Sequence, residues 1–170
     1  MPEPTRTQSD FRSAMANLSA AVNVVTTDGP HGRAGMTVSA ACSVTDSPPT
    51  VLVCVNRSSR SHNVLVGNGR LCVNVLAGEH EDLAMHFAGA TKVPTAERFT
   101  DDRWDLTSHG VPVLRGAAAT VIGRIRTRRE LGSHTVLFVD VEQVGTQDDG
   151  GALVYFQRRF HSLGAPRLSA

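Results

Sequence analysis

GMTVSAACSVTDSPPTVLVCVNRSSRSH, residues 35–62, is the stretch of the chain that decides its fold. Its first part alternates apolar and hydroxyl-bearing or small side chains, a pattern that predicts a strand with one buried face: Val38, Ala40, Cys42 and Val44. The segment 46–49, DSPP, predicts a turn because proline fixes φ and removes a hydrogen-bond donor. The run 50–55, TVLVCV, is almost continuously apolar and predicts a second strand, buried on both sides.

A polar loop follows this second strand at residues 56–61, NRSSRS. Ser61 is suited to cap a helix that starts at His62, and serines, arginines and a helix start together form a plausible anion site. A solvated turn is the alternative, and it is the more common structure of short loops with this composition.

Composition limits the classes of function. The chain has 170 residues, which suits one domain, and its net charge of +1 gives no field that attracts nucleic acid or an anionic membrane. Aromatic residues make up 5%, too few for a base-stacking surface. Neither the three cysteines nor the seven histidines have metal-ligand spacing, so we expect no metal site. We interpret Cys42, Cys54 and Cys72 as small buried hydrophobic residues in a reducing compartment.

We also expect a cytoplasmic protein that does not enter a membrane. The first ten residues are polar and do not resemble a signal peptide, and no apolar run approaches membrane-spanning length.

The rest of the chain predicts a mainly β, antiparallel (α+β) domain over residues 9–162, with a flexible arm at 1–8 and a tail at 163–170. About seven short strands separated by turns, with a few peripheral helices, indicate a closed or partly closed barrel. Residues 88–112 lack periodicity and predict a long loop with one helical turn. We expect helices from Ser9 or Asp10 and over 79–87, and further strands over 21–27, 70–76, 116–129, 135–144 and 152–156.

Several ordered blocks resemble the short-chain flavin reductases, the reductase components of two-component flavin-dependent monooxygenases of the 4-hydroxyphenylacetate 3-monooxygenase type. The resemblance extends from about Phe11 to Phe160. It implies a split β-barrel, a homodimer, and transfer of hydride from NAD(P)H to flavin N5, with the reduced flavin passing to a separate monooxygenase. The blocks are 11–27, 35–62, GNGRLCVNVL (67–76), MHFAG (85–89), GSHTVLFVDVEQV (132–144) and LVYFQRRF (153–160).

The resemblance also implies which residues bind the flavin. Along the isoalloxazine ring it places Ala34, Gly35, Met36, Thr37, Ser39 and Ala40, mainly through backbone amides. Beside the ring and ribityl chain it places Cys54, Val55 and Asn56, and next to the flavin His86 and Phe87. Around the phosphate it places Ser59, Arg60 and Ser61, which favours the anion site over the solvated turn.

On the nicotinamide side the resemblance implies His134, Tyr155, Phe156 and Arg158. The family often has Gly-Asp-His where this chain has Gly132-Ser133-His134, so the carboxylate that would orient the histidine is missing. A turn histidine that bonds to a carbonyl is the alternative for His134.

Hydride transfer requires positioning of two rings rather than an acid–base group, and the chain has neither a nucleophile triad nor a Gly-x-Gly-x-x-Gly fingerprint. The subfamily that the chain resembles tends to use FAD, so we expect FAD rather than FMN, and NADH rather than NADPH. Two alternatives have other functions. One is a flavin-binding split barrel without turnover, a carrier or sensor, and the other is an oligonucleotide-binding barrel, which the charge and the few aromatics disfavour.

Overall fold

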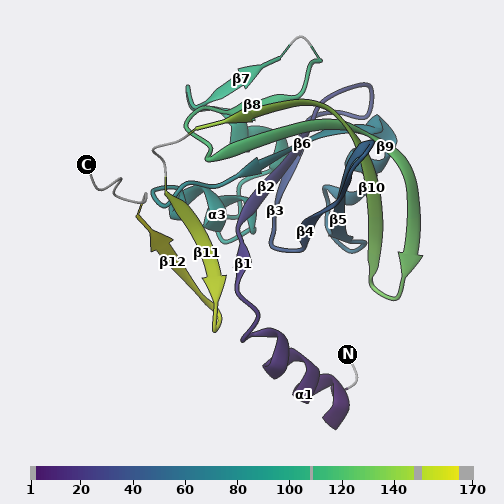
Figure 1. Ribbon diagram of the computed structural model, residues 1–170, viewed down its shortest axis with the longest axis vertical. Helices are drawn as coiled ribbons and strands as arrows, with labels where there is room; N and C mark the ends of the chain where they lie inside the picture. Colours follow the sequence, from purple (N-terminus) through teal and green to yellow (C-terminus); the bar gives the residue numbers. More distant parts are fainter. Residues whose placement is uncertain (1–2, 108, 148–150, 165–170) are drawn as a thin grey trace.

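The computed structural model describes residues 3–107, 109–147 and 151–164, and its centre is a seven-stranded antiparallel sheet (Figure 1). The strand order is β3-β2-β6-β9-β10-β5-β4. A second sheet has the order β1-β11-β12, and a two-stranded ribbon consists of β7 and β8. The predicted mainly β, antiparallel fold is confirmed.

The large sheet contains the strands β2 (Asn23–Thr27), β3 (Ala34–Val38), β4 (Ala41–Asp46), β5 (Pro49–Asn56), β6 (Arg70–Val75), β9 (Ala119–Leu131) and β10 (His134–Thr146). The small sheet contains β1 (Ala20–Ala21), β11 (Ala152–Phe156) and β12 (Arg159–Leu163), and the ribbon contains β7 (Trp104–Leu106) and β8 (Pro112–Leu114). The helices are α1 (Arg6–Met15), α2 (His62–Asn68), α3 (Glu81–Phe87) and the 3-10 helix η1 (Thr95–Phe99).

The sheet curves on itself because its two edge strands follow one another in the chain. β3 and β4 lie at opposite edges in the strand order, but only Ser39 and Ala40 separate them. The carbonyl of Ala40 accepts a hydrogen bond from the backbone N–H of Cys54 on β5 at 2.9 Å. The sheet must therefore bend until its edges meet, which gives a barrel.

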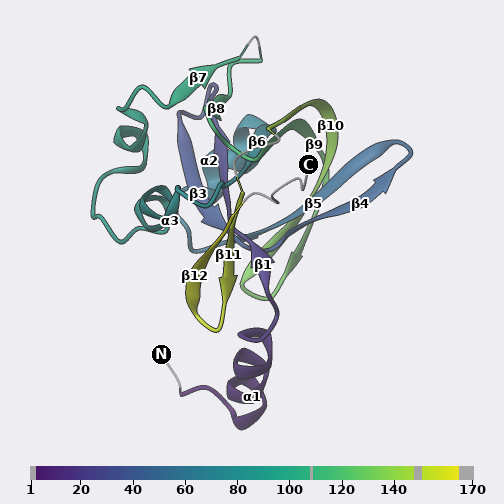
Figure 2. The same ribbon diagram turned by 60° about the vertical axis from the view of Figure 1, so that its left-hand side comes forward.

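β2 is buried along its whole length because apolar residues cover both of its faces. Inside the barrel, Val25 packs with Leu71, Val53 and Leu137. Outside it, Val24 belongs to a second cluster that includes Phe87 of α3 and residues of β8 and β11. Helix α3 and the β11–β12 hairpin therefore lie against the outside of the barrel wall, as Figure 2 shows.

Several predicted boundaries are wrong. The first helix begins at Arg6 rather than at Ser9 or Asp10. The Thr5 side chain caps it by accepting the N–H of Gln8, and the Gln8 side chain accepts the N–H of Thr5, so part of the predicted arm is helical. The single strand predicted through Val38 and Val44 is two strands, β3 and β4. Residues 1–2 of the arm and 165–170 of the tail lie outside the described residues.

The predicted burial of the central stretch is also partly wrong. Cys42 and Val44 on β4 are exposed because no layer covers this edge strand, and Cys54 is only partly buried. The sequence predicts that all three cysteines are buried, and this is correct only for Cys72. In the run 50–55, Thr50, Val53 and Val55 are buried and the other three residues are half-buried, so β5 is less covered than predicted.

Three strands were not predicted. The loop predicted over 88–112 contains η1 and β7, β8 begins at its end, and residues 159–163 after β11 form β12. In the part of the chain that the structure describes, no helix has the length and apolar character needed to cross a bilayer.

Candidate functional site

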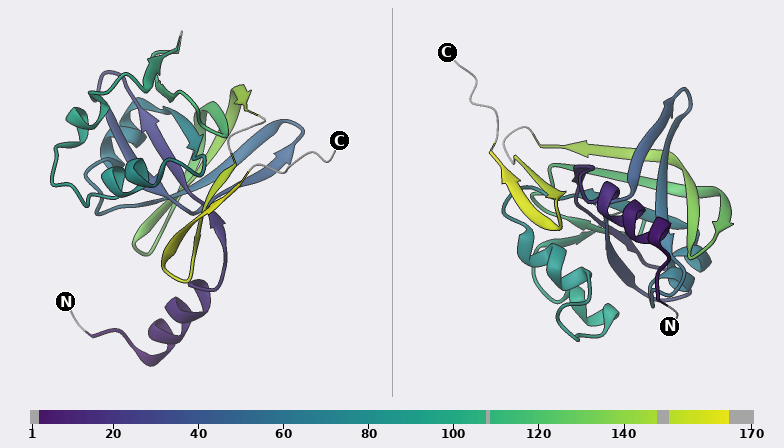
Figure 3. Two further views of the ribbon diagram at one scale, coloured as in Figure 1. Left: turned by 90° about the vertical axis from the view of Figure 1, so that its left-hand side faces the viewer. Right: turned by 90° about the horizontal axis from the view of Figure 1, so that it is seen from below.

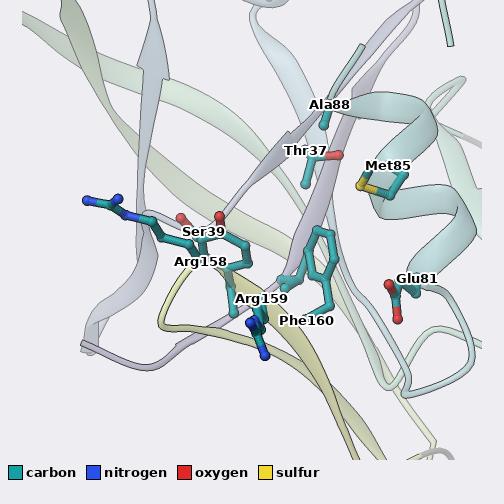
Figure 4. Close-up of a pocket in the computed structure, with 10 residues that line it drawn as sticks. Thr37, Ser39, Glu81, Met85, Ala88, Arg158, Arg159 and Phe160 are labelled. Carbon is teal, nitrogen blue, oxygen red and sulfur yellow. The ribbon is translucent and has the colours of Figure 1, made fainter. Parts of the chain in front are cut away.

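Strand β3 passes between two cavities on the outer surface of the barrel. The first, called here the large cavity, has a volume of about 660 Å³ (Figure 4). Thr37 lines it from β3 and Ser39 from the turn after β3. Its other walls come from α3, with Glu81, Met85 and the adjacent Ala88, and from the β11–β12 hairpin, with Tyr155, Arg158, Arg159 and Phe160. Val22, between β1 and β2, completes the lining.

The walls of the large cavity are held together by direct contacts. The hydroxyl of Thr37 donates to the carbonyl of Ala84 at 2.6 Å and so fixes β3 against α3. The rings of Tyr155 and Phe160 pack with 5.2 Å between their centroids, which fixes the β11–β12 wall. Apolar walls with a few polar groups are typical of sites for flat organic ligands.

The second cavity, called here the cationic cavity, has a volume of about 430 Å³. Three cationic side chains line it, Arg60, Lys92 and Arg98, and its lining contains no carboxylate. Arg98 is held in place by hydrogen bonds to the carbonyls of Val93 at 3.0 Å and Phe87 at 3.3 Å. Burial and the neighbouring charge of Arg60 lower the pKa of Arg98. An anion bound here would relieve the repulsion between these cations.

Ser61 does not have the role that the sequence suggests. It precedes α2, but its side chain makes no capping hydrogen bond. Instead it is only 3% exposed, and its hydroxyl donates to the carbonyl of Gly35 at 2.9 Å. Ser61 therefore ties the polar loop to β3 and places the cationic cavity next to that strand.

Gly35 is required at its position by close packing. A Cβ atom there would lie 2.7 Å from Cε1 of Phe87 and 3.0 Å from Cζ of Phe99. Phe87 also makes an edge contact with Trp104, with 5.4 Å between ring centroids. The glycine thus allows α3 and η1 to approach β3, and the two cavities share Ala88 at this junction.

The predicted flavin residues fall into two groups. Ser59, Arg60, Ser61, Gly35, Met36 and Phe87 line the cationic cavity, and Thr37 and Ser39 line the large cavity. Ala34, Ala40, Cys54, Val55, Asn56 and His86 line neither. Among this second group, Val55 is fully buried, Asn56 accepts two hydrogen bonds from Ser58, and His86 bonds to Thr91.

The predicted nicotinamide residues are not brought together within one chain. Tyr155 and Arg158 line the large cavity, whereas His134 starts β10 and pairs with Asn56. Figure 1 and the right panel of Figure 3 show the β9–β10 tip and the β11–β12 hairpin on different sides of the barrel. Phe156 does not line the large cavity, and its ring lies 6.0 Å from that of His161. Ser133 bonds to Nδ1 of His134 at 2.9 Å, in the position where the family often has an aspartate.

Sequence reasoning missed several lining residues, among them the charged Glu81, Lys92, Arg98 and Arg159 and the apolar Met85. Lys92 could have been singled out from the sequence, because it is the single lysine in an arginine-rich chain. No sequence pattern singles out Arg98, because it lies in the segment without periodicity.

Comparison with known proteins agrees with this geometry. Residues 15–164 match the model of the flavin reductase like domain. The chain belongs to this family. The 4-hydroxyphenylacetate 3-monooxygenase reductase component of Pseudomonas aeruginosa is 53% identical over 163 residues, which cover 96% of each chain. The FMN reductase (NADH) RutF of Stutzerimonas stutzeri is 49% identical over 156 residues, with 92% of this chain and 88% of the relative covered.

Solved structures agree as well. The NADH:FAD oxidoreductase of Streptomyces globisporus, in complex with NAD and FAD fragments, superposes with a TM-score of 0.85 at 28% identity and covers 99% of both chains. The predicted flavin reductase family and its split-barrel fold are therefore confirmed.

Proposed function

We propose that this chain is an NADH-dependent flavin reductase that supplies reduced flavin to a separate monooxygenase. Its relatives include the reductase component of a monooxygenase and an NADH-dependent FMN reductase. A solved relative is an NADH:FAD oxidoreductase. The homology and the site geometry support the same activity.

The observation that carries the proposal is the pairing of two chemically different cavities along β3. The large cavity has mainly apolar walls, and the cationic cavity has three positive side chains and no carboxylate in its lining. A flavin has the same two parts, an apolar ring system and an anionic phosphate arm. Because the cavities share Ala88, one flavin can extend through both.

In this arrangement each residue has a role that needs no proton transfer. Arg60, Lys92 and Arg98 hold the phosphate arm through charge-assisted hydrogen bonds. Thr37 and Ser39 lie along the ring, and Tyr155 of β11 and Arg158 of the turn after β11 face it and bind the nicotinamide dinucleotide. The flavin and the nicotinamide supply the hydride chemistry, and the protein holds the two rings in register and excludes water.

The first test is NADH oxidation in air by the purified chain without flavin, with FAD and with FMN. We expect turnover only with added flavin, and a lower Michaelis constant for FAD than for FMN. Lys92→Ala should raise the flavin Michaelis constant about tenfold with kcat almost unchanged, because loss of one charge-assisted hydrogen bond weakens binding without touching the rings. Arg6→Ala, on the exposed first helix, is the matched control and should change neither constant.

A flavin-binding protein without turnover, a carrier or sensor, is the alternative. It would bind FAD but leave NADH unoxidised with either flavin. His134→Ala separates the nicotinamide role of this histidine from a structural one. A raised Michaelis constant for NADH alone supports the role, and unchanged kinetics for both substrates rule it out.

We further propose a homodimer that involves the edge strand β4. Its exposed Val44 (48%) and Cys42 lie on a hairpin with β5 that projects from the barrel (Figures 2 and 3). Next to it is a mainly apolar cavity of about 190 Å³, lined among others by Ala41, Val51 and Val121. An exposed, partly apolar edge strand is a common protein-interaction surface. Analytical ultracentrifugation should give a dimer that Val44→Lys dissociates. A monomeric wild-type chain would contradict the proposal.

A cytoplasmic location is also proposed, on the basis of the three free cysteines.

A further inference from the structure

A third cavity, called here the adjoining cavity, lies between α1 and the β11–β12 hairpin. It has a volume of about 530 Å³, and it shares Ser39, Tyr155 and Arg158 with the large cavity. The two cavities are therefore neighbours, and Arg158 borders both. Five residues line the adjoining cavity alone, and none of them has a role in the flavin or nicotinamide binding proposed above: Arg12, Met15, Ala16, Leu18 and Ala20.

The charges of the adjoining cavity have one sign. Two guanidinium groups line it, Arg12 from α1 and Arg158 from the hairpin turn, and its lining contains no carboxylate. The ion pair on α1 joins Arg6 to Asp10, and within the described residues neither Arg12 nor Arg158 has an ion-pair partner. Two unpaired guanidinium groups across a cavity favour a ligand with two negative charges.

The position of Arg158 is fixed by an uncommon backbone geometry. Gln157 and Arg158 have φ values of 48° and 62°, in the left-handed region that residues other than glycine seldom adopt. The segment after α1 holds this turn. The backbone N–H of Gln157 donates to the carbonyl of Ala16 at 2.7 Å, and its side-chain amide donates to Oδ1 of Asn17 at 3.1 Å. Strained residues that the surrounding structure holds in place are often found at ligand sites.

We propose that the adjoining cavity binds the diphosphate of NADH, with Arg158 and Arg12 on successive phosphates. This inference rests on the proposed function, because it requires the nicotinamide ring to lie in the large cavity. Arg158 borders both cavities and therefore contacts the phosphate on the nicotinamide side. Arg12 borders only the adjoining cavity and contacts the phosphate on the adenosine side. Met15 and Leu18, 45% and 65% exposed, provide apolar surface for the adenosine.

The order of the two arginines leads to a test with a shortened substrate. Reduced nicotinamide mononucleotide has the nicotinamide-side phosphate but lacks the adenosine-side phosphate and the adenosine. Arg12→Ala should raise the Michaelis constant for NADH about tenfold and leave that for the mononucleotide unchanged. Arg158→Ala should raise both constants. Arg6→Ala removes a guanidinium from the same helix without touching the cavity, and it should change neither.

A second measurement needs no flavin and no turnover. Isothermal titration of the protein with adenosine diphosphate ribose should show binding that Arg12→Ala weakens about tenfold. This arm separates the inference from the proposed function. Absence of NADH oxidation by the wild-type chain would overturn the reductase activity, whereas the titration reports on the adjoining cavity alone.

Three results would overturn the inference. The first is an equal effect of Arg12→Ala on NADH and on the mononucleotide, and the second is unchanged binding of adenosine diphosphate ribose. The third is a shift of the monomer–dimer equilibrium by Arg12→Ala with unaltered NADH kinetics, which would show that a second copy of the chain covers α1. Circular dichroism should show that each variant remains folded.

Discussion

Replacement of Gly35 by alanine tests the packing that joins the two cavities. The added Cβ would lie 2.7 Å from Cε1 and 3.0 Å from Cδ1 of Phe87, and 3.0 Å from Cζ of Phe99. These contacts are too short, so both rings or β3 must move. Phe87 is almost fully buried and packs edge-on against Phe99 and Trp104, with centroid distances of 5.1 and 5.4 Å, so its ring has little space into which it can turn.

Overpacking of this kind costs about 1–3 kcal/mol. For a chain of this length, a loss of about 2 kcal/mol lowers the melting temperature by about 4–8 °C. Thermal unfolding followed by circular dichroism measures the shift. The emission of Trp104, the single tryptophan, reports locally on the aromatic cluster.

Two control variants show whether close packing, rather than the added methyl group itself, causes the loss of stability. Gly164→Ala adds the same methyl group where, apart from its chain neighbours, no atom of the described residues lies within 4 Å, so it should leave the melting temperature unchanged. Phe87→Leu in the Gly35→Ala background makes room for the methyl group, and the two substitutions should be less than additive. A melting temperature of Gly35→Ala within 1 °C of the wild type would refute the packing argument.

Three other perturbations have defined outcomes. Ser61→Ala removes the buried hydrogen bond to β3 and should lower the free energy of unfolding by about 1–3 kcal/mol, measured by urea denaturation; a change in the flavin Michaelis constant alone would contradict this. Burial lowers the pKa of His80, whose Nδ1 accepts the N–H of Ala77, so the folded state favours the neutral ring. Its contribution to stability should be complete above about pH 6.5 and decrease as the pH falls below that value, and His80→Asn should flatten this dependence. Iodoacetamide should modify the exposed Cys42 first and Cys72 only after denaturation, because burial raises the pKa of Cys72 to about 12; mass spectrometry of tryptic peptides checks the order.

Strands in which apolar and polar side chains alternate strictly were predicted well from the sequence. β11 has the predicted limits, 152–156, and β6 at 70–75 differs from its prediction by one residue. The break between β3 and β4 could not be predicted, because Ser39 and Ala40 continue the alternation and give no turn signal. The hairpin to β12 was missed because its turn uses Gln157 and Arg158 in place of the usual glycine or asparagine.

The site was predictable where the family motifs are local and not where the fold brings distant segments together. The loop with Ser59 and Arg60, which the resemblance assigns to the flavin phosphate, lines the cationic cavity. Lys92 and Arg98 reach the same cavity from a segment without periodicity, so only the folded chain shows them. The separation of His134 from Tyr155 likewise depends on which strands pair, and no sequence pattern gives that.

The pairing of β1 with β11 has a consequence for how the protein is made. Ala20 lies opposite Tyr155 and Ala21 opposite Val154, so two segments more than 130 residues apart in the chain pair with each other. The hairpin that follows supplies four of the residues that enclose the large cavity. Barrel strands can begin to pair while the chain is still growing, but this wall must wait until residues 152–163 have been made. A nascent or truncated chain that stops before β11 would therefore lack one wall of the large cavity.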